Sequence, residues 1–289
     1  MNSHILVVGG TGRLGRLLCE AWEFQGARQP LWQARRQVPF AGSVFDPLAE
    51  PGAYRDAAKG AVAILNLAGR ASSGTAAPGE HSTLALAALE AGRAASVRHV
   101  FLASSAAVYG ACEDPMDEAS LLRPLSAYGR EKRKMEEDAR GWANRAGRDA
   151  PGVTCLRIGN VAGADQILGG DGKAVPALDF FADGRSPRRS YIGPLALASV
   201  LGQLFQCVED GRNLPFHLNV ALEGTVAMDA LLAADGRRWH EVPAGPGAIP
   251  EVRLDVARLK ALVDLPAGGT DAAAIVTDLR TLRPRDGSA

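Results

Sequence analysis

The stretch Ile5-Leu6-Val7-Val8-Gly9-Gly10-Thr11-Gly12-Arg13-Leu14-Gly15 decides the fold class of this chain. Its first four residues are apolar and are followed by glycine, which predicts a short buried strand because the run is too short for a helix. Residues 14–24 then carry apolar side chains at helical spacing. A glycine-rich turn between a strand and a helix is typical of a phosphate-binding loop.

The glycines of this turn have separate roles in such a loop. One makes the tight turn, Gly12 lets the backbone approach a pyrophosphate, and Gly15 lets the helix pack close to the strand. The N-terminus of the helix favours the negative charge of the phosphates. We therefore predict that a dinucleotide binds to Gly9, Gly10, Thr11, Gly12, Arg13, Leu14 and Gly15.

Outward from this turn, short apolar runs alternate with longer helical patterns. The predicted strands are 5–8, 31–34, 61–67, 100–103 and 153–158, and the predicted helices are 14–24, 82–95 and 126–146. Such alternation predicts βαβ units and a parallel sheet that is covered by helices on both faces, which is an α/β fold.

The pattern loosens after Gly163. We predict a helix at 195–208, a strand at 215–221, a loop at 243–250 and a helix at 255–262, with a frayed tail after Arg283. The predicted domains are a dinucleotide-binding domain at 1–163 and a mostly substrate-binding region at 164–289. Within the second region, residues 195–221 are expected to return to the first domain.

Composition excludes several classes of protein. The 289 residues include 32 Lys+Arg and 32 Asp+Glu, and this balance argues against a nucleic-acid or membrane-surface binder. No apolar run is long enough to cross a membrane and no signal peptide is evident, so we expect a soluble cytoplasmic protein. The cysteines stand far apart, which predicts reduced thiols and neither a disulfide scaffold nor a zinc site: Cys19, Cys112, Cys155 and Cys207. No other cluster has metal-ligand spacing, so we expect no metal.

The end of the second predicted strand bears on the choice of cofactor. NAD-binding proteins usually place an acidic residue about 20 residues beyond the glycines, to hold the ribose hydroxyls. This chain has Ala34-Arg35-Arg36 there. A guanidinium group suits a 2′-phosphate, so Arg35 and Arg36 favour NADP, with NAD as the alternative. The other interpretation of the two arginines is a solvated surface pair.

A second group of residues suggests proton-transfer chemistry. Tyr128 and Lys132 are four residues apart on a predicted helix and share one face. A free tyrosine has a pKa of about 10, and a nearby ammonium group together with the positive nicotinamide ring favours the phenolate. Ser104 and Ser105 end a predicted strand, where Ser105 is expected to hold a substrate oxygen near the phenol. The alternative for Tyr128 and Lys132 is a solvated helix face.

These features together resemble the extended short-chain dehydrogenase/reductases, a group of nucleotide-sugar epimerases and related reductases. The resemblance is carried from residue 4 to 163 by the glycine loop and by Asn66-Leu67-Ala68-Gly69, Ser104-Ser105-Ala106-Ala107-Val108-Tyr109-Gly110, Tyr128-Gly129-Arg130-Glu131-Lys132 and Arg157-Ile158-Gly159-Asn160-Val161-Ala162-Gly163.

The resemblance implies a Rossmann-type doubly wound parallel sheet and a homodimer. It implies Ser105, Tyr128 and Lys132 as catalytic residues, with Tyr128 as general acid/base and Lys132 also holding the ribose. It places Leu67, Ala68, Gly69 and Ser104 against the cofactor and Asn160 near the substrate. Asp46 matches a position that contacts adenine, although a helix N-cap explains this residue almost equally well.

Several residues depart from the family pattern. His81 stands where the family usually has Asn, and we interpret it as a structural variant. Ala106 and Ala107 replace the acidic pair that 4,6-dehydratases need, which argues against dehydration. Ala196 stands where an Asp is usual, and the region after Gly163 is short for enclosing a whole nucleotide-sugar.

The sequence leaves three functions open. One is an epimerase or oxidoreductase that transfers hydride at a C–OH/C=O carbon of a sugar or nucleotide-sugar. Another is an NADPH-dependent reductase or dehydrogenase of a smaller carbonyl compound. The third is a non-catalytic NADP-sensing protein. In the substrate region, a basic cluster is expected either to meet a phosphate or carboxylate or to lie in a solvated loop: Arg185, Arg188 and Arg189.

Overall fold

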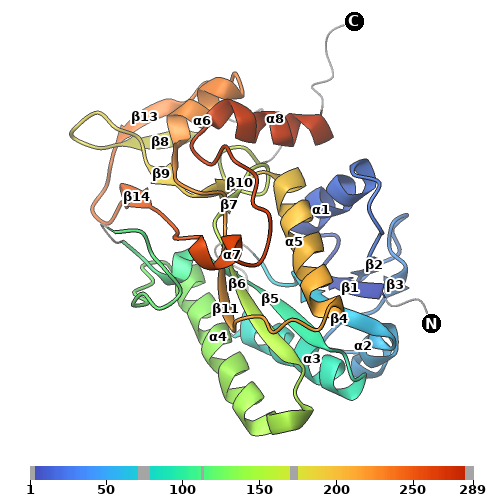
Figure 1. The fold of residues 1–289 in the computed structure, drawn as a ribbon. Helices are drawn as coiled ribbons and strands as arrows, with labels where there is room; N and C mark the ends of the chain where they lie inside the picture. Colours follow the sequence, from blue (N-terminus) through green and yellow to red (C-terminus); the bar gives the residue numbers. More distant parts are fainter. Residues whose placement is uncertain (1–3, 71–78, 112–113, 170–174, 284–289) are drawn as a thin grey trace, which may run out of the picture.

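The computed structural model describes residues 4–70, 79–111, 114–169 and 175–283 (Figure 1). Its centre is a parallel sheet of seven strands. In spatial order the strands are β11 (His217–Val220), β6 (Gly152–Ile158), β5 (His99–Ser105), β4 (Ala61–Asn66), β1 (His4–Val8), β2 (Leu31–Ala34) and β3 (Ser43–Val44). The predicted parallel α/β fold is thereby confirmed.

Helices cover both faces of this sheet. One face carries α1 (Arg13–Phe24) and α5 (Pro194–Glu209), and the other carries α2 (Pro51–Ala58), α3 (Glu80–Ala94) and α4 (Ala127–Ala146). The side chains of β1 alternate between the two layers, so that Val7 joins the core beneath α1 while Leu6 and Val8 join the core beneath α3. This alternation follows from the two-residue period of a strand and explains why the run is apolar throughout.

The second half of the chain contributes to two regions. Helix α5 packs on α1, and β11 pairs with β6, so the segment that contains them extends the main sheet. The rest forms three small sheets: β7 (Asn160–Val161) with β10 (Tyr191–Ile192), β9 (Arg188–Arg189) between β12 (Val226–Ala227) and β14 (Glu251–Val252), and β8 (Ala177–Phe180) with β13 (His240–Pro243). Helices α6 (Met228–Ala234) and α8 (Ala272–Leu282) pack together at the top of Figure 1.

In the last part of the chain one predicted helix has the wrong bounds and one helix was not predicted. The helix predicted at 255–262 is the short α7 (Ala257–Lys260), because the Asp255 carboxylate accepts a hydrogen bond from the Ala257 N–H at 2.7 Å and stands outside the helix. Helix α8 was not predicted from the sequence. Short 3-10 turns η1 (Ala106–Val108) and η2 (Gly147–Asp149) follow β5 and α4. None of the helices in the described ranges is long and apolar enough to span a membrane.

The strand order places the candidate site. The sheet runs outward in opposite directions from the pair β1 and β4, so the connections after these two strands leave toward opposite faces. In open α/β sheets ligands bind at this switch point, outside the carboxyl ends of the strands. The glycine loop follows β1 and residues 67–69 follow β4, so both predicted cofactor segments lie there.

Candidate active site

The glycine loop is held tightly at the switch point. The N–H groups of Gly9 and Gly10 donate to the side-chain and backbone oxygens of Gln33, each at 3.0 Å. A Cβ on Gly9 would lie 2.8 Å from the nitrogen of Ala68, and one on Gly15 would lie 2.5 Å from the carbonyl oxygen of Gly9. The loop therefore forms a cradle that side chains would fill, which fits a site for a pyrophosphate. The buried Gln33 was not singled out from the sequence.

Arg13 links this loop to the second half of the chain. Its Nη1 donates to the carbonyl oxygens of Ala164 at 3.0 Å and Asp165 at 3.2 Å. Leu14 packs against the core beneath α1, Thr11 is half-buried and Gly12 is exposed. Arg13 therefore belongs to the loop, but its guanidinium group makes a tertiary contact that the sequence did not predict.

Arg35 and Arg36 are exposed directly after β2. Neither makes a hydrogen bond or an ion pair with another described residue, so both guanidinium groups are available to an anion. Asp46 lies nearby, and its Oδ1 accepts hydrogen bonds from the N–H groups of Leu48 at 2.9 Å and Ala49 at 3.1 Å. These bonds, and more weakly Arg35, lower the pKa of Asp46. Asp46 therefore caps the turn that leads to α2.

The end of β4 approaches the glycine loop from the other side. The Asn66 side chain accepts from the Ala68 N–H at 3.2 Å and donates to the Leu84 carbonyl at 3.4 Å, which fixes residues 67–69 against α3. Gly69 has a φ of +130°, and a Cβ there would lie 2.4 Å from Nδ1 of His81. Leu67 and Ala68 are half-buried and Gly69 is exposed.

His81 is buried between this segment and Tyr128. Its ring stands edge-on to the phenol ring, with the centroids 5.7 Å apart. Burial, together with the charge of Lys132, lowers the pKa of His81 to about 4, so the ring is neutral at pH 7. The residue that departs from the family pattern thus forms part of the wall beside the phenol.

Ser105, Tyr128 and Lys132 meet at the carboxyl end of β5. Helix α4 begins after Ser126, whose hydroxyl accepts from the Gly129 N–H at 3.0 Å. The Tyr128 phenol hydrogen-bonds the Ser105 side chain. Lys132 lies one turn further, with Nζ 5.7 Å from the centre of the phenol ring. The structure therefore brings the three residues together, which excludes a merely solvated helix face for Tyr128 and Lys132.

Burial dominates the electrostatics of this group in the free protein. Burial raises the pKa of Tyr128, and the hydrogen bond with Ser105 only partly opposes this. Burial also lowers the pKa of Lys132 to about 8. The predicted lowering of the phenol's pKa involves the positive nicotinamide ring as well as the ammonium group, and it stays a prediction for the protein with its cofactor. In the free protein the phenol is protonated at neutral pH and is ready to donate.

Ser104 faces away from the other predicted cofactor residues. Its hydroxyl donates to Glu136 Oε1 at 2.5 Å, deep in the protein. Glu136 also forms an ion pair with Arg157, whose Nη2 lies 2.8 Å from Oε2. Arg157 donates to the Tyr109 hydroxyl at 3.0 Å, which donates in turn to Asn219 at 2.7 Å. The sequence did not single out this buried network.

The predicted substrate residues lie in different surroundings. Asn160 is on β7 and hydrogen-bonds the Tyr191 side chain. Arg185 is 75% exposed and pairs with Asp183, which supports the solvated-loop interpretation. Arg189 is half-buried and donates to the carbonyl oxygens of Arg188 at 2.7 Å and Pro250 at 3.4 Å.

The N-terminus of α5 explains the departure at Ala196. Asp278 on α8 accepts hydrogen bonds from the N–H groups of Leu195 at 2.8 Å and Ala196 at 3.0 Å. A Cβ on Gly193 would lie 2.2 Å from the Cγ of Asp278, so a glycine is needed at this approach. A carboxylate thus caps this helix from a segment more than 80 residues later in the chain.

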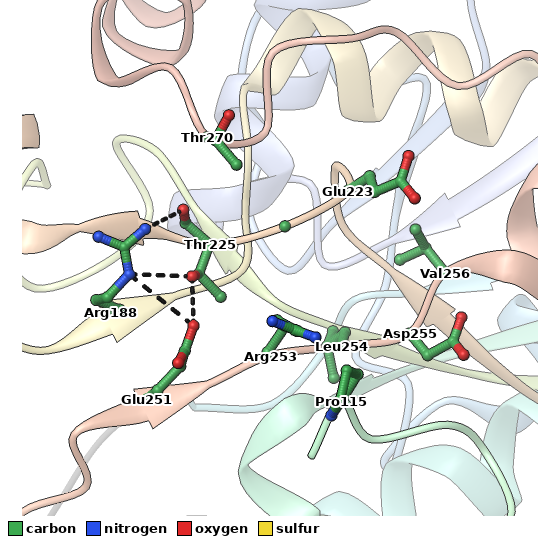
Figure 2. A pocket seen from close by; sticks show the side chains of 11 residues that line it. Pro115, Arg188, Glu223, Thr225, Glu251, Arg253, Leu254, Asp255, Val256 and Thr270 are labelled. Carbon is green, nitrogen blue, oxygen red and sulfur yellow. Dashed lines mark hydrogen bonds and ion pairs between the residues drawn. The ribbon is translucent and has the colours of Figure 1, made fainter. Parts of the chain in front are cut away.

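A polar cavity of about 570 Å³ lies away from the predicted site (Figure 2). Arg188, Thr225 and Glu251 bond to one another on its wall. The lining residues are Pro115, Arg188, Glu223, Gly224, Thr225, Glu251, Arg253, Leu254, Asp255, Val256 and Thr270. Of the residues that the sequence analysis singled out, Arg188 lines this cavity, whereas Ser105, Tyr128 and Lys132 do not. Within the described ranges, no three His, Cys, Asp or Glu residues are grouped to hold a metal, and Cys19, Cys155 and Cys207 are free; Cys112 lies outside these ranges.

Comparison with known proteins places the chain in a family. The sequence profile of the NAD dependent epimerase/dehydratase family matches residues 5–180. The chain belongs to this family. The resemblance to extended short-chain dehydrogenase/reductases is thereby confirmed. No curated protein sequence matches the chain.

Solved structures share the fold over nearly the whole length. UDP-glucose 4-epimerase from Brucella ovis in complex with NAD has 19% identity and a TM-score of 0.78, with 97% of each chain covered. A short-chain dehydrogenase/reductase superfamily protein from Agrobacterium tumefaciens with bound NAD has 21% identity, a TM-score of 0.76 and the same coverage. UDP-glucose-4-epimerase from Stenotrophomonas maltophila, with bound NAD and formylated UDP-arabinopyranose, has 20% identity and a TM-score of 0.73, with 97% of this chain and 98% of that chain covered.

Proposed function

We propose that this protein is an NAD(P)-dependent epimerase or oxidoreductase that acts at a C–OH/C=O carbon of a sugar or nucleotide-sugar. The observation that carries the proposal is the meeting of Ser105, Tyr128 and Lys132 beside the glycine loop and the end of β4. The nucleotide-sugar class is supported by solved neighbours that bind UDP-arabinopyranose or UDP-glucose.

Each residue of the group has a distinct task in this chemistry. Tyr128 exchanges a proton with the reacting oxygen: the phenol, which its raised pKa keeps protonated in the free protein, donates when a carbonyl is reduced, and the phenolate accepts the proton when an alcohol is oxidised. Ser105 holds the same oxygen through the hydroxyl that now bonds the phenol. Lys132 supplies positive charge beside the phenol as the proton leaves. A bound NAD(P) supplies the site that accepts a hydride from the substrate carbon or returns one to it.

The fit of the cofactor rests on the cradle at the switch point. Gly9 and Gly15 let the loop pack closely against Ala68 and the start of α1, and the N-terminus of α1 would receive the pyrophosphate. Arg35 and Arg36 are exposed at the end of β2 and bond to no other described residue, which favours NADP. We expect tighter binding of NADPH than of NADH in a fluorescence titration, and Arg35→Ala should remove the difference. Equal affinities in the native protein would overturn this preference.

The proposed chemistry is tested with UDP-glucose as the probe substrate. The native protein is incubated with it and with NAD+ or NADP+, and sugar products are separated while absorbance at 340 nm is followed. Tyr128→Phe should abolish turnover and leave dinucleotide affinity within about twofold. Tyr54→Phe is the matched control, because this buried tyrosine on α2 carries no hydrogen bond within the described ranges. Equal turnover by the Tyr128 variant and the native protein would refute the assignment.

A second function is favoured by the free arginines at β2. An NADPH-dependent reductase of a smaller carbonyl compound would release its cofactor after each turnover, whereas an epimerase would retain it. Denaturing the purified protein and analysing the released nucleotide separates the two: retained NAD(H) supports the epimerase, and a free site supports the reductase.

From the resemblance to extended short-chain dehydrogenase/reductases we also propose a homodimer that forms through α3 and α4. Light scattering on the native protein tests this proposal.

A further inference from the structure

Glu136 lies on the same face of α4 as the proposed catalytic residues. Tyr128, Lys132 and Glu136 are spaced four residues apart, so they lie above one another on successive turns. All three bond to the last three residues of β5, at 103–105. The phenol bonds Ser105, Lys132 Nζ donates to the Ala103 carbonyl at 2.7 Å, and Ser104 donates to Glu136 at 2.5 Å.

The Glu136 carboxylate joins three strands to this helix. It is 2% exposed and accepts from Ser104 on β5. Arg157 on β6 lies directly opposite Ser104 in the sheet. Its Nε donates to Oε1 of Glu136 at 3.1 Å and to Oε2 at 3.2 Å, and its Nη2 donates to Oε2 at 2.8 Å. His217 on β11 places Nε2 3.4 Å from Oε2. A carboxylate in this position fixes the distance between α4 and the end of β5.

The same carboxylate sets the charge beside Lys132. The ammonium group is buried, which lowers the pKa of Lys132 to about 8, and the charges of Cys155 and Glu136 oppose this lowering. Burial raises the pKa of the Cys155 thiol well above its usual value, so Glu136 is the anion present at neutral pH. Titratable and charged groups surround this pair on several packed elements. They are Tyr128 and Arg140 on α4, His81 on α3, Tyr109 after η1, Cys155 and Arg157 on β6, and His217 on β11.

We propose that Glu136 is a positioning residue of the active site. It locks the end of β5 to α4, so that Ser105 meets the Tyr128 phenol, and it keeps Lys132 charged while a dinucleotide is bound. The inference rests on the proposed function, because Lys132 matters here only as a group that faces the ribose of the dinucleotide.

The test is a titration with NADPH, or with NADH if that binds more tightly, at pH values from 6 to 10. The affinity of the native protein should fall where Lys132 loses its proton. In Glu136→Gln, affinity at pH 7 should fall about 3- to 10-fold, and the midpoint of the alkaline loss should move down by at least half a pH unit. Glu136→Asp retains the charge and should restore the midpoint.

A second variant separates this role from simple support of the fold. The double variant Glu136→Gln/Arg157→Met removes both charges of the buried pair and should recover much of the thermal stability lost by the single variant. A positioning role predicts that its alkaline midpoint stays shifted, whereas a purely structural role predicts that stability and midpoint recover together. Recovery of both, or an unshifted midpoint in Glu136→Gln, would overturn the inference. A native protein that binds neither dinucleotide would instead refute the proposed function, and this inference with it.

Discussion

Replacing Gly15 by alanine should weaken both the fold and dinucleotide binding. The added Cβ would lie 2.5 Å from the carbonyl oxygen of Gly9, 2.7 Å from that of Gly10 and 2.8 Å from the Gly10 carbonyl carbon. All three are backbone atoms, so relief requires that α1 move away from the loop. Overpacking of this kind costs about 1–3 kcal/mol, and we take the upper end because no side chain can turn aside.

The net loss in the free energy of unfolding is smaller than this strain energy. Alanine is a better helix former than glycine by about 1 kcal/mol, which leaves a net loss of about 2 kcal/mol. For a protein of this size the loss corresponds to a fall in Tm of about 3 °C, measured by circular dichroism or calorimetry. Movement of α1 also opens the phosphate cradle, so we expect NADH or NADPH to bind at least about 10-fold more weakly.

The matched control is Gly52→Ala in α2. No heavy atom lies within 4 Å of a Cβ at Gly52, and its φ is not positive. The same substitution should therefore leave Tm unchanged or raise it by a few degrees, through the gain of about 0.5–1 kcal/mol expected for Gly→Ala in a helix. If Gly15→Ala melts at or above the native temperature and binds the dinucleotide normally, the close approach of α1 to the loop is not needed and the reasoning fails.

Other perturbations test the buried charges and the long-range cap. Arg157→Met leaves the Glu136 carboxylate buried without its main partner and should lower the free energy of unfolding by about 3–5 kcal/mol. Arg133→Met removes one partner of an exposed pair and should lower it by less than about 1 kcal/mol. Similar melting temperatures of the two variants would contradict this. Burial lowers the pKa of His81 and His99 to about 4 and that of His217 to about 3. The unfolded chain therefore binds protons on these residues at a higher pH than the folded protein does. Stability should therefore be fully present above about pH 6.5 and be lost progressively between pH 6.5 and 4; a flat Tm from pH 7.5 to 5 would exclude this linkage. Asp278→Ala should cost about 1 kcal/mol by uncapping α5, and an unchanged urea midpoint would show that water replaces the cap.

Patterns in neighbouring residues predicted the elements that the structure shows in the first half. The run at 31–34 is β2 without any change in its bounds, and the helix predicted at 126–146 is α4 with Ser126 as its N-cap. These segments are specified by their own hydrophobic period and capping residues, which act within a few residues of one another. Helix α8 packs against α5 and α6. It was missed although Gly268-Gly269 and the capping residue Asp271 precede it and Pro284 follows it, so start and stop signals were present in the sequence.

The residues of the candidate site also fall into two groups: those that sequence spacing relates and those that only tertiary contacts bring together. Tyr128 and Lys132 share a helix face, and the sequence spacing alone required this. The partner of Glu136 did not follow from spacing, because Arg157 reaches it only through the pairing of β5 with β6. The raised pKa of Tyr128 in the free protein did not follow from spacing either, because burial depends on what packs around the phenol and no local pattern records it.

Local patterns in the chain were sufficient to predict the glycine turn, the alternation of strands and helices, and the candidate residues Ser105, Tyr128 and Lys132. Each of these depends on backbone conformations and periods that neighbouring residues specify. Three contacts could be found only from the folded protein: Ser104 donates to Glu136, Arg13 holds the loop after β7, and Asp278 caps α5. These contacts join residues that are distant in the chain, and they form because a buried polar group must find a partner wherever packing has left one.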